Sequence, residues 1–496
     1  TGVAMRAVVD DRDLGELNGA HPDRIAGMAW AVSAVLAGVA GILLAGEQGI
    51  RVEPLVLLTI NAYAAAIIGR LRSLPRTFIG ALLLGLLDSY YLSYSDQNWF
   101  PKTAFGFSLS GLRASIPTIV LFVALVLMPQ SRLRTGISRL REKHREPAWS
   151  TALIGTAVLV GFTVAVSGMM NRPNSLLFIN ALLFSIAALS LVPLTGYAGQ
   201  VSLAPLSFAG LGAIAMAKVP GNGNLLSLLL TMVIVGAVGA LVALPALRLT
   251  GVYLALSTAA FAVLVSNLVF NQKETFYSGN IAVPPLRIPG LEAGSPRARM
   301  IVLAIAFGVL GLLVVAVRRS RLGRRLIAIK DSPAAAATLG MNVTGSKVAA
   351  FAISAAIASC AGALAGSKVS PQQYDFLQSL PVVLLTVLGG VAAVSGALLG
   401  GFFLGGNSTL QAIAGSKFVK DFLQVLPGTM GITLGRSPAG VTEETSEGFR
   451  GLIGRWNLIA IAIGGGVVLW ALTTTGAVTR WGFVASIAAW SLTVVP

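Results

Sequence analysis

The stretch that decides how this chain is built is MRAVVDDRDLGELNGA, residues 5–20, because a segment of the same kind recurs as LIAIKDSPAAAATLGM at residues 326–341. The offset of 321 residues holds without a gap over residues 5–41 and 326–362. Each copy combines a basic residue, an Asp and a Gly, and each leads directly into a long apolar segment. Polar, cationic loops of this kind are typical of the cytoplasmic side of a membrane protein, so the sequence predicts an internal duplication.

Composition places the chain in a bilayer. Hydrophobic residues make up 55% of it, charged residues only 11%, and the mean hydropathy is +0.81. The sequence therefore predicts an all-α, polytopic helical membrane protein with about 14 to 16 membrane segments, including short or broken helices. Long apolar runs lie at residues 25–46, 76–95, 152–170, 175–194, 225–248, 251–270, 299–317, 348–367, 396–415 and 456–475. Shorter or Gly-broken runs lie at residues 54–69, 113–128, 199–218, 379–391, 418–435 and 481–496.

The positive charge is interpreted as a determinant of topology. The net charge of +17 would suggest nucleic acid as the partner of a soluble protein. Here the basic residues gather between apolar runs, at residues 70–76, 132–145 and 318–330. The positive-inside rule places these three clusters in the cytoplasm, provided that segments 54–69 and 113–128 both cross the membrane. No nucleic acid is expected as a partner.

The residues that usually carry catalysis or bind metals are scarce. Cys360 is the single cysteine and lies in an apolar run, and the two histidines are His21 and His144. No HExxH, CxxC or phosphate-loop motif occurs. We therefore expect no catalytic residue, no metal site and no cofactor on this chain.

Basic and acidic linkers divide the sequence. Residues 129–147 predict a basic cytoplasmic linker and residues 436–455 a second linker. Residues 1–128 are interpreted as the C-terminal part of a first membrane unit, residues 148–435 as a complete second unit, and residues 456–496 as the start of a further one. Ser486–Leu492 repeats Ser185–Leu191 with one change. We expect the chain to be a slice of a longer fusion; a coincidence of small residues in two membrane helices is the alternative.

A polar, Gly-rich motif interrupts the apolar sequence of the second unit. It reads LTGYAGQVSL at residues 194–203 and is followed by Phe208. A helix break at membrane depth is tolerated only where it faces protein or a wet cavity, so the motif predicts a pathway lining. The candidate pathway residues are Gly196, Tyr197, Gly199, Gln200, Ser202 and Phe208.

These motifs resemble a known family. The GYAGQVSL segment, the loop that begins at Asp331, and Gly389-Gly390 followed by Gly396 and Gly400 are similar to the inner-membrane permeases of branched-chain amino acid ABC importers. The second unit resembles one of the two permease subunits from end to end. Residues 1 to about 128 resemble the final third of its partner subunit, so the chain looks like a fusion of both types, truncated at both ends.

The resemblance implies that the duplicated loop forms a short coupling helix that docks on a cytoplasmic ATPase. The residues implied are Ala7, Asp10, Leu17, Gly19, Ala328, Asp331, Ala335, Ala336, Leu339 and Gly340. The physical logic agrees: small apolar residues fill a groove, an early Asp can cap the helix and a Gly can end it. An ordinary amphipathic connector lying on the membrane is the alternative.

The resemblance also implies partners. Two cytoplasmic ATP-binding subunits would hold ATP and Mg²⁺, a second permease half would complete the path within the lipid of the plasma membrane, and an extracytoplasmic binding protein would deliver the solute. Ser278, Gly279 and Asn280 are candidate contacts for that protein, because their loop falls on the side opposite the basic clusters.

Two departures from the family pattern matter. Ala204-Pro205 stands where the family usually has Gly and His, which leaves the solute open. In the first loop Arg12, Asp13 and Glu16 replace smaller residues of the second loop, so the two loops are expected to dock on different ATPase subunits.

The leading hypothesis is therefore a transport subunit, not an enzyme, for branched-chain or related hydrophobic amino acids. The alternative is an ATP-independent secondary transporter or channel for a small polar solute. A proton-driven carrier needs paired ionisable residues at membrane depth, and Asp88 is almost alone there. For Asp88 a structural hydrogen bond to a neighbouring helix is favoured over contact with the solute.

Overall fold

The computed structural model describes residues 2–127 and 148–413, together with residues 464, 465 and 468. Within these ranges it leaves out residues 11, 50–51, 72, 96, 98, 102, 105–106, 109–110, 169, 247–248, 250, 273–274, 277–278, 289–290 and 293. The predicted spans at 418–435, 456–475 and 481–496 and the predicted linkers at 129–147 and 436–455 thus lie outside the described residues or nearly so.

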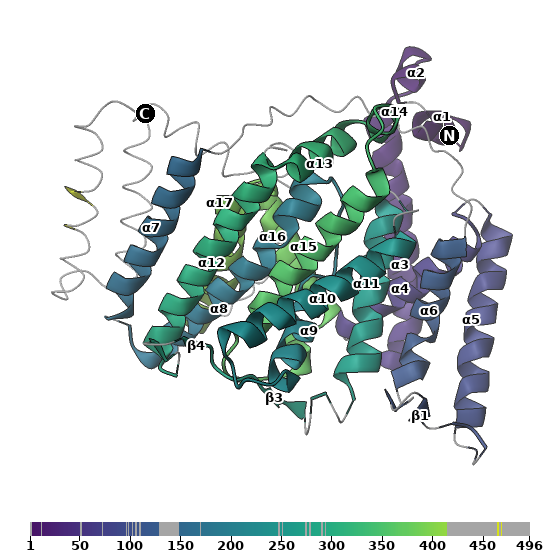
Figure 1. The fold of residues 1–496 in the computed structure, drawn as a ribbon. Coiled ribbons are helices and arrows are strands. Elements are labelled where there is room, and N and C mark those ends of the chain that lie inside the picture. The colour runs from purple at the N-terminus through teal and green to yellow at the C-terminus, as the bar shows by residue number, and fades with distance from the viewer. Residues whose placement is uncertain are drawn as a thin grey trace. The chain divides into compact units, whose positions relative to one another are not determined.

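Helices dominate the described chain (Figure 1). They are α1 (Gly2–Asp10), α2 (Arg12–Leu17), α3 (Pro22–Gln48), α4 (Val52–Ile68), α5 (Leu74–Ser95), α6 (Leu112–Leu127), α7 (Trp149–Ser167), α8 (Arg172–Leu189), α9 (Pro205–Lys218), α10 (Leu225–Ala246), α11 (Val252–Val265), α12 (Pro296–Arg319), α13 (Arg321–Asp331), α14 (Pro333–Thr338), α15 (Val343–Ala363), α16 (Phe376–Gly390) and α17 (Val394–Ile413). Shorter helical turns are the π-helical η2 (Val192–Tyr197) and η3 (Ser266–Phe270) and the 3-10 helix η5 (Pro371–Tyr374).

Three short antiparallel strand pairs join the helices. Strand β1 (Thr103–Ala104) pairs with β2 (Phe107–Ser108), β3 (Ile281–Ala282) with β6 (Lys368–Val369), and β4 (Arg287–Ile288) with β5 (Leu291–Glu292). Since each strand has only two residues, the pairs tie loops together and form no layer of their own.

The prediction of an all-α, polytopic membrane protein is confirmed. Seven described helices are long and apolar enough to cross a bilayer, and five more apolar helices are shorter. Each span predicted before residue 416 corresponds to a helix. The one clear displacement is the span predicted at 199–218, whose helix α9 begins only at Pro205. Residues 198–204 form a turn there instead.

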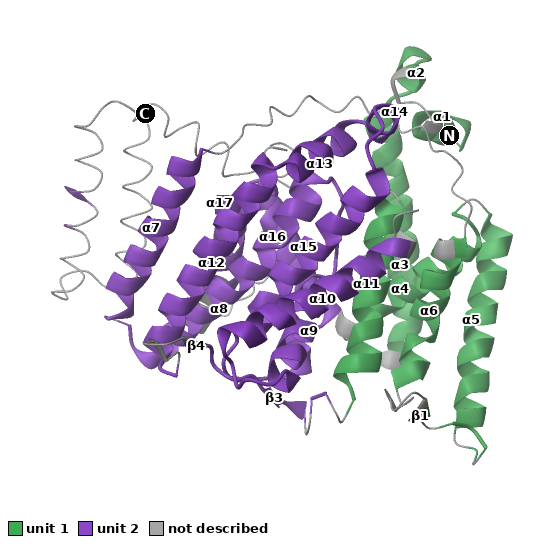
Figure 2. Cartoon of the chain, viewed as in Figure 1, with its two compact units in different colours: residues 1–143, 248–272 green, residues 144–247, 273–496 purple. Residues whose placement is uncertain are grey.

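The described chain forms two compact units (Figure 2). Unit 1 comprises residues 1–143 and 248–272, and unit 2 comprises residues 144–247 and 273–496. In unit 1, α4 packs against α5 and α6, and α6 packs against α11. Helix α11 comes from the stretch that the sequence assigns to the second membrane unit, so chain order and spatial grouping differ at this helix.

Unit 2 is built around α15, which α9 and α10 cover, while α17 packs along α8. Glycines make these crossings close. A Cβ at Gly362 would overlap the Ala209 carbonyl oxygen, and a Cβ at Gly212 would overlap that of Ser359. Because lipid tails are as apolar as the helices, such backbone approach is a main source of helix association in membranes.

The crossing of α9 and α15 gives a stability prediction. Gly362→Ala should destabilise the protein by about 1–3 kcal/mol, since the new methyl group meets backbone that cannot rotate away. Thermal unfolding of the purified protein in detergent measures the effect. The matched control is Gly161→Ala on α7, where a Cβ meets no atom within 4 Å. Equal unfolding temperatures for the two variants would contradict the packing described.

Candidate functional site

The duplicated loop folds as two elbows of the same design. The first elbow (residues 2–20) contains α1 and α2, and the second elbow (residues 321–341) contains α13 and α14. Helix α2 spans residues 12–17 and α14 spans residues 333–338, which are the same positions at the offset of 321. The long helices that follow, α3 and α15, begin at Pro22 and Val343, again 321 residues apart.

The hydrogen bonds that end the elbows also repeat. The backbone N–H of Gly19 donates to Glu16 O at 2.9 Å, and that of Ala20 to Gly15 O at 3.0 Å. In the second copy Gly340 donates to Ala337 O at 3.0 Å, and Met341 to Ala336 O at 3.1 Å. Gly19 and Gly340 have φ of +83° and +75°, in the left-handed region where glycine is favoured. The predicted role of glycine as the helix stop is confirmed.

The predicted capping residue is wrong by one position. Asp331 is the last residue of α13, and Ser332 is the N-cap of α14, where its side chain accepts from the Ala335 N–H at 3.3 Å. Ser332 is the one residue between α13 and α14, and its backbone is extended, with φ −154° and ψ 101°. Its side chain can therefore reach the backbone N–H groups in the first turn of α14, whereas Asp331 is still helical.

The elbows present apolar surface at their tips. Leu17 is 82% exposed and Leu339 is 74% exposed. Exposed with them are Ala7, Gly19, Asp331, Ala335 and Gly340. Ala328 is half-buried, and Ala336 is buried and supports the second elbow from inside. Asp10 ends α1, and its side chain lies outside the described part of the chain.

The Gly-rich motif forms a largely buried turn after α8, in which Gly199 and Val201 are exposed. Helix α8 ends in η2, where Pro193 has no N–H to donate to the preceding turn and the helix widens. The Thr195 hydroxyl donates to Gln200 O at 3.0 Å, and the Gln200 N–H donates to Leu194 O at 3.0 Å. We call residues 192–204 the buried turn. Its predicted pathway residues that are buried are Gly196, Tyr197, Gln200 and Ser202, and Phe208 is buried on α9.

The second elbow touches this buried turn directly. Lys330 Nζ of α13 donates to Gly196 O at 3.2 Å. Gly199 has φ +65°, and a Cβ there would lie 2.9 Å from Lys330 Cγ. The guanidinium carbon of Arg318, at the end of α12, lies 5.9 Å from the centre of the Tyr197 ring. The structure therefore brings the predicted coupling loop and the predicted pathway motif together.

Sequence reasoning treated Arg318 and Lys330 only as topology determinants. Arg318 is 6% exposed, so it is a buried cation rather than a solvated one. The sequence did contain one signal for a buried and paired Arg318, because it is a cationic residue at the very end of a long apolar run. Such a side chain is costly to bury without a partner. The sequence does not show that Tyr197, which is far from Arg318 along the chain, lies beside it in the fold.

A third element reaches the same turn. A Cβ at Gly196 would lie 2.5 Å from Val391 O, in the residue that follows α16. Helices α12, α13 and α16 thus converge on the buried turn.

The loop predicted to contact a binding protein lies at the other end of unit 2. Gly279 and Asn280 are exposed, and β3 directly after them lies at the end of the unit opposite α13 (Figure 1). Ser278 lies outside the described residues.

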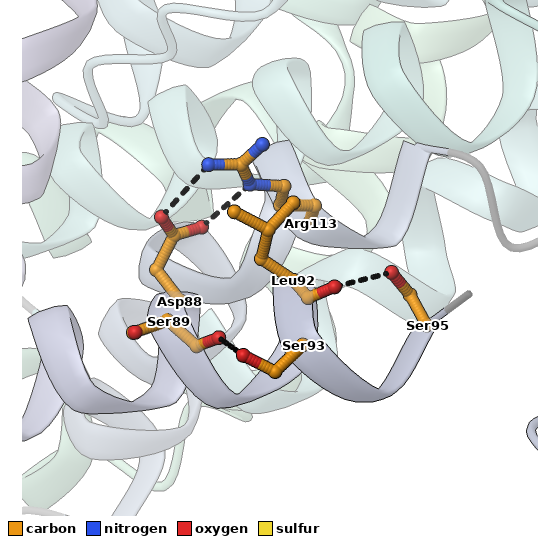
Figure 3. Close-up of polar contacts among 6 residues, drawn as sticks. All are labelled: Asp88, Ser89, Leu92, Ser93, Ser95 and Arg113. Atoms are coloured by element: carbon orange, nitrogen blue, oxygen red, sulfur yellow. Dashed lines mark hydrogen bonds and ion pairs between the residues drawn. The ribbon is translucent and has the colours of Figure 1, made fainter. Parts of the chain in front are cut away.

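The structural interpretation of Asp88 is confirmed. Its carboxylate oxygens accept from Arg113 Nε at 3.1 Å and Nη2 at 3.2 Å (Figure 3). Asp88 lies on α5 and Arg113 on α6, so the pair joins neighbouring helices of unit 1 with bidentate geometry.

Comparison with known proteins identifies the family of this chain. The family model "Branched-chain amino acid transport system / permease component" matches residues 1–129 and 175–433. The chain belongs to this permease family. As a member, it is a multi-pass membrane component of an ABC importer, a transport subunit whose family works with ATP-binding and substrate-binding partners.

Individual relatives are similar to parts of this permease. The high-affinity branched-chain amino acid transport system permease protein LivM of Salmonella typhimurium is 28% identical over 322 residues, which cover 58% of this chain and 74% of LivM. The permease protein LivH of Escherichia coli is 35% identical over 102 residues, which cover 19% of this chain and 33% of LivH. The chain thus spans about a third of the LivH that it matches. No solved structure matches it.

The stacking of Arg318 on Tyr197 gives a second prediction. Cation–π contacts contribute about 0.5–2 kcal/mol, with the larger values at buried sites. Because Arg318 and Tyr197 are both buried, a double-mutant cycle with Arg318→Met and Tyr197→Leu should show a coupling free energy near the larger value. Thermal unfolding of the four proteins measures it. Arg319 and Trp149 are the matched reference pair, also at 5.9 Å but exposed, and should couple less. Strictly additive effects at the buried pair would contradict a direct interaction.

Proposed function

We propose that the chain is the transmembrane permease of an importer that translocates branched-chain or related hydrophobic amino acids, driven by two separate ATP-binding subunits that dock on the two elbows. Those subunits hold the ATP and Mg²⁺, a second permease half completes the path, and an extracytoplasmic binding protein delivers the solute. The observation that carries the proposal is the hydrogen bond of Lys330 in the second elbow to the Gly196 carbonyl in the buried turn.

The coupling follows from the continuity of these elements. A docked ATP-binding subunit contacts the exposed Ala335 on α14 and the exposed Leu339 directly after this helix. When that subunit moves, α13 moves with α14, and Lys330 displaces the backbone of the buried turn. The glycines at 196 and 199 let the turn lie against α13 and the end of α16 without side chains between them.

The strength of these contacts suits a switch. A hydrogen bond from a charged donor contributes about 1.5–3 kcal/mol, and a partly buried cation–π contact about 0.5–2 kcal/mol. The coupling free energies of allosteric proteins are about 1–3 kcal/mol. The contacts around Gly196 and Tyr197 are thus strong enough to transmit a movement and weak enough to be remade in each cycle.

Unpartnered polar atoms support a pathway through the buried turn. Gln200 Oε1 and Ser207 Oγ are buried and have no hydrogen-bond partner within the described part of the protein. Leaving such atoms unsatisfied is costly, so a solute that offers polar groups to them would be stabilised there. The proposed pathway residues are Gly196, Tyr197, Gly199, Gln200, Ser202 and Phe208.

The alternative of an ATP-independent carrier has less support. Asp88 and Arg113, on neighbouring apolar helices of unit 1, satisfy each other's hydrogen-bonding groups. An ATP-independent carrier also does not explain why the chain has two matching elbows, each with an exposed leucine at its tip.

Leu339→Ser tests the docking role. Burying a leucine side chain at an interface contributes about 1.5–3 kcal/mol, so the affinity for the ATP-binding subunits should fall about 10-fold to 100-fold, with amino acid uptake falling in parallel. The assay is co-purification and leucine uptake in proteoliposomes that contain the full transporter. The matched control is Leu225→Ser, an exposed leucine at the start of α10, which should leave both unchanged. Unaltered subunit affinity in Leu339→Ser would refute docking on the second elbow.

A further inference from the structure

We propose that the N-terminal end of α9 is a subsite for the carboxylate group of the solute, and that Ser207 is the residue that holds this group. The proposal rests on the proposed function for the class of solute, and it adds which chemical group of the solute is recognised and where. We call this place the α9 subsite. It consists of the N–H and the hydroxyl group of Ser207, in the first turn of the helix that begins at Pro205.

Helix α9 begins inside the protein rather than at its surface. Its first three residues, Pro205, Leu206 and Ser207, are all buried. The helix has 14 residues. At about 1.5 Å per residue its length is about 21 Å, whereas the hydrocarbon core of a bilayer is about 30 Å thick. A helix that begins at such a depth presents the positive end of its macrodipole to the interior, where little solvent screens it.

The backbone donors at this helix end can be accounted for one by one. The first four N–H groups of a helix have no partner within it. The N–H of the N-cap residue, Ala204, donates to a serine hydroxyl of the buried turn at 3.4 Å, and Pro205 has no N–H. The Leu206 N–H donates to Ser379 Oγ at 3.3 Å. The fourth N–H belongs to Ser207, and α9 receives no side-chain cap from its N-cap residue.

The hydroxyl group of Ser207 has no hydrogen-bond partner in the described part of the protein. The residue is 0% exposed, so water from the surface does not satisfy it. Because each Cα–Cβ bond of a helix is tilted toward the N-terminus, this hydroxyl lies at the same end of α9 as the Ser207 N–H. Two neighbouring donors fit a group that accepts two hydrogen bonds, and a carboxylate is such a group.

The charges around the buried turn favour an anion over a cation. Residues 192–208 comprise the buried turn and the first turn of α9, and they contain no Asp or Glu. Lys330 brings its ammonium group to the Gly196 carbonyl. Arg318 brings its guanidinium group to the Tyr197 ring. Both cations and the positive end of α9 act in the same direction, so a negative group of the solute is stabilised here.

A second buried atom fits the other polar group of an amino acid. Gln200 is 5% exposed, and its Oε1 has no hydrogen-bond partner among the residues that the structure describes. An amide oxygen accepts hydrogen bonds and does not donate them, so it suits an ammonium group. The buried turn and α9 thus offer donors for a carboxylate and an acceptor for an ammonium group, which are the two groups of every α-amino acid.

A purely structural role of Ser207 predicts a different behaviour. Removal of an unsatisfied buried hydroxyl relieves the cost of its desolvation, so Ser207→Ala should leave the stability of the protein unchanged or raise it. If the hydroxyl had no ligand, solute binding would be unaffected as well. A loss of solute binding without a loss of stability therefore distinguishes a binding residue from a structural one.

Ser207→Ala in the full transporter tests the α9 subsite. The transporter is placed in nanodiscs, and the binding protein is left out so that its own selectivity does not contribute. The probe is radiolabelled leucine in equilibrium dialysis. Its Kd should rise about 10-fold or more in the variant, with an equal or higher unfolding temperature. The matched control is Ser185→Ala on α8, where the buried hydroxyl donates to Ala181 O at 2.8 Å. This control should bind leucine normally and unfold at a lower temperature.

Competition with analogues identifies the recognised group on the unaltered transporter. Isocaproate keeps the carboxylate and the side chain of leucine but lacks the ammonium group, whereas leucinamide keeps the ammonium group and the side chain but lacks the carboxylate. Because the α9 subsite offers donors to a negative charge, isocaproate should displace radiolabelled leucine and leucinamide should not.

The outcomes separate this proposal from the proposed function. An unchanged Kd for leucine in Ser207→Ala, no saturable leucine binding by the unaltered transporter, or displacement by leucinamide as effective as that by isocaproate would each overturn the α9 subsite. Displacement by chloride as effective as that by isocaproate would assign the donors to an inorganic anion and would also overturn it. Failure of the proposed function is measured separately, as absent leucine uptake by proteoliposomes that contain the unaltered transporter, its binding protein and ATP.

Discussion

The structure depends on how a helix can break inside a membrane protein. Where α8 ends, backbone carbonyls lose their helical donors, and bulk water does not replace them because most of the turn is buried in protein. The protein supplies donors instead: the Thr195 hydroxyl, the Gln200 N–H and the Lys330 ammonium group. Two of these donors belong to the buried turn itself, and the third comes from the second elbow. The hydrogen bond from Lys330 thus both satisfies a carbonyl of the turn and connects the turn to the second elbow.

Close helix packing makes that connection effective. Gly362 against Ala209 and Gly212 against Ser359 leave α9 and α15 little space to slide, and Gly196 also lies close to Val391. A bundle with such contacts moves as a few rigid pieces, because packed interiors shift between discrete arrangements. Movement of α13 is therefore expected to displace the buried turn as a body. The proposed solute path and the proposed docking elbow would then share one mechanical element.

The sequence predicted much of this because the decisive signals were local. Gly19 and Gly340 end their helices through left-handed backbone, which only the immediate neighbours determine, and the elbows consequently match residue for residue. Asp331 was mistaken for the cap because Asp and Ser cap equally well in sequence, and only the backbone angles of Ser332 decide. The stacking of Arg318 on Tyr197 and the grouping of α11 with α6 depend on contacts across many residues, which periodicity cannot reveal.

The location of the elbows on the cytoplasmic side is the claim that supports all the rest. Cys360 is buried and is the single cysteine, so Leu339→Cys creates one reactive, exposed thiol without removing any other. A membrane-impermeant maleimide is added to right-side-out and to inverted vesicles. Labelling of residue 339 in inverted vesicles alone is the result that this account predicts. Labelling from the outer side of intact vesicles would contradict it and remove the elbows from any contact with ATP-binding subunits.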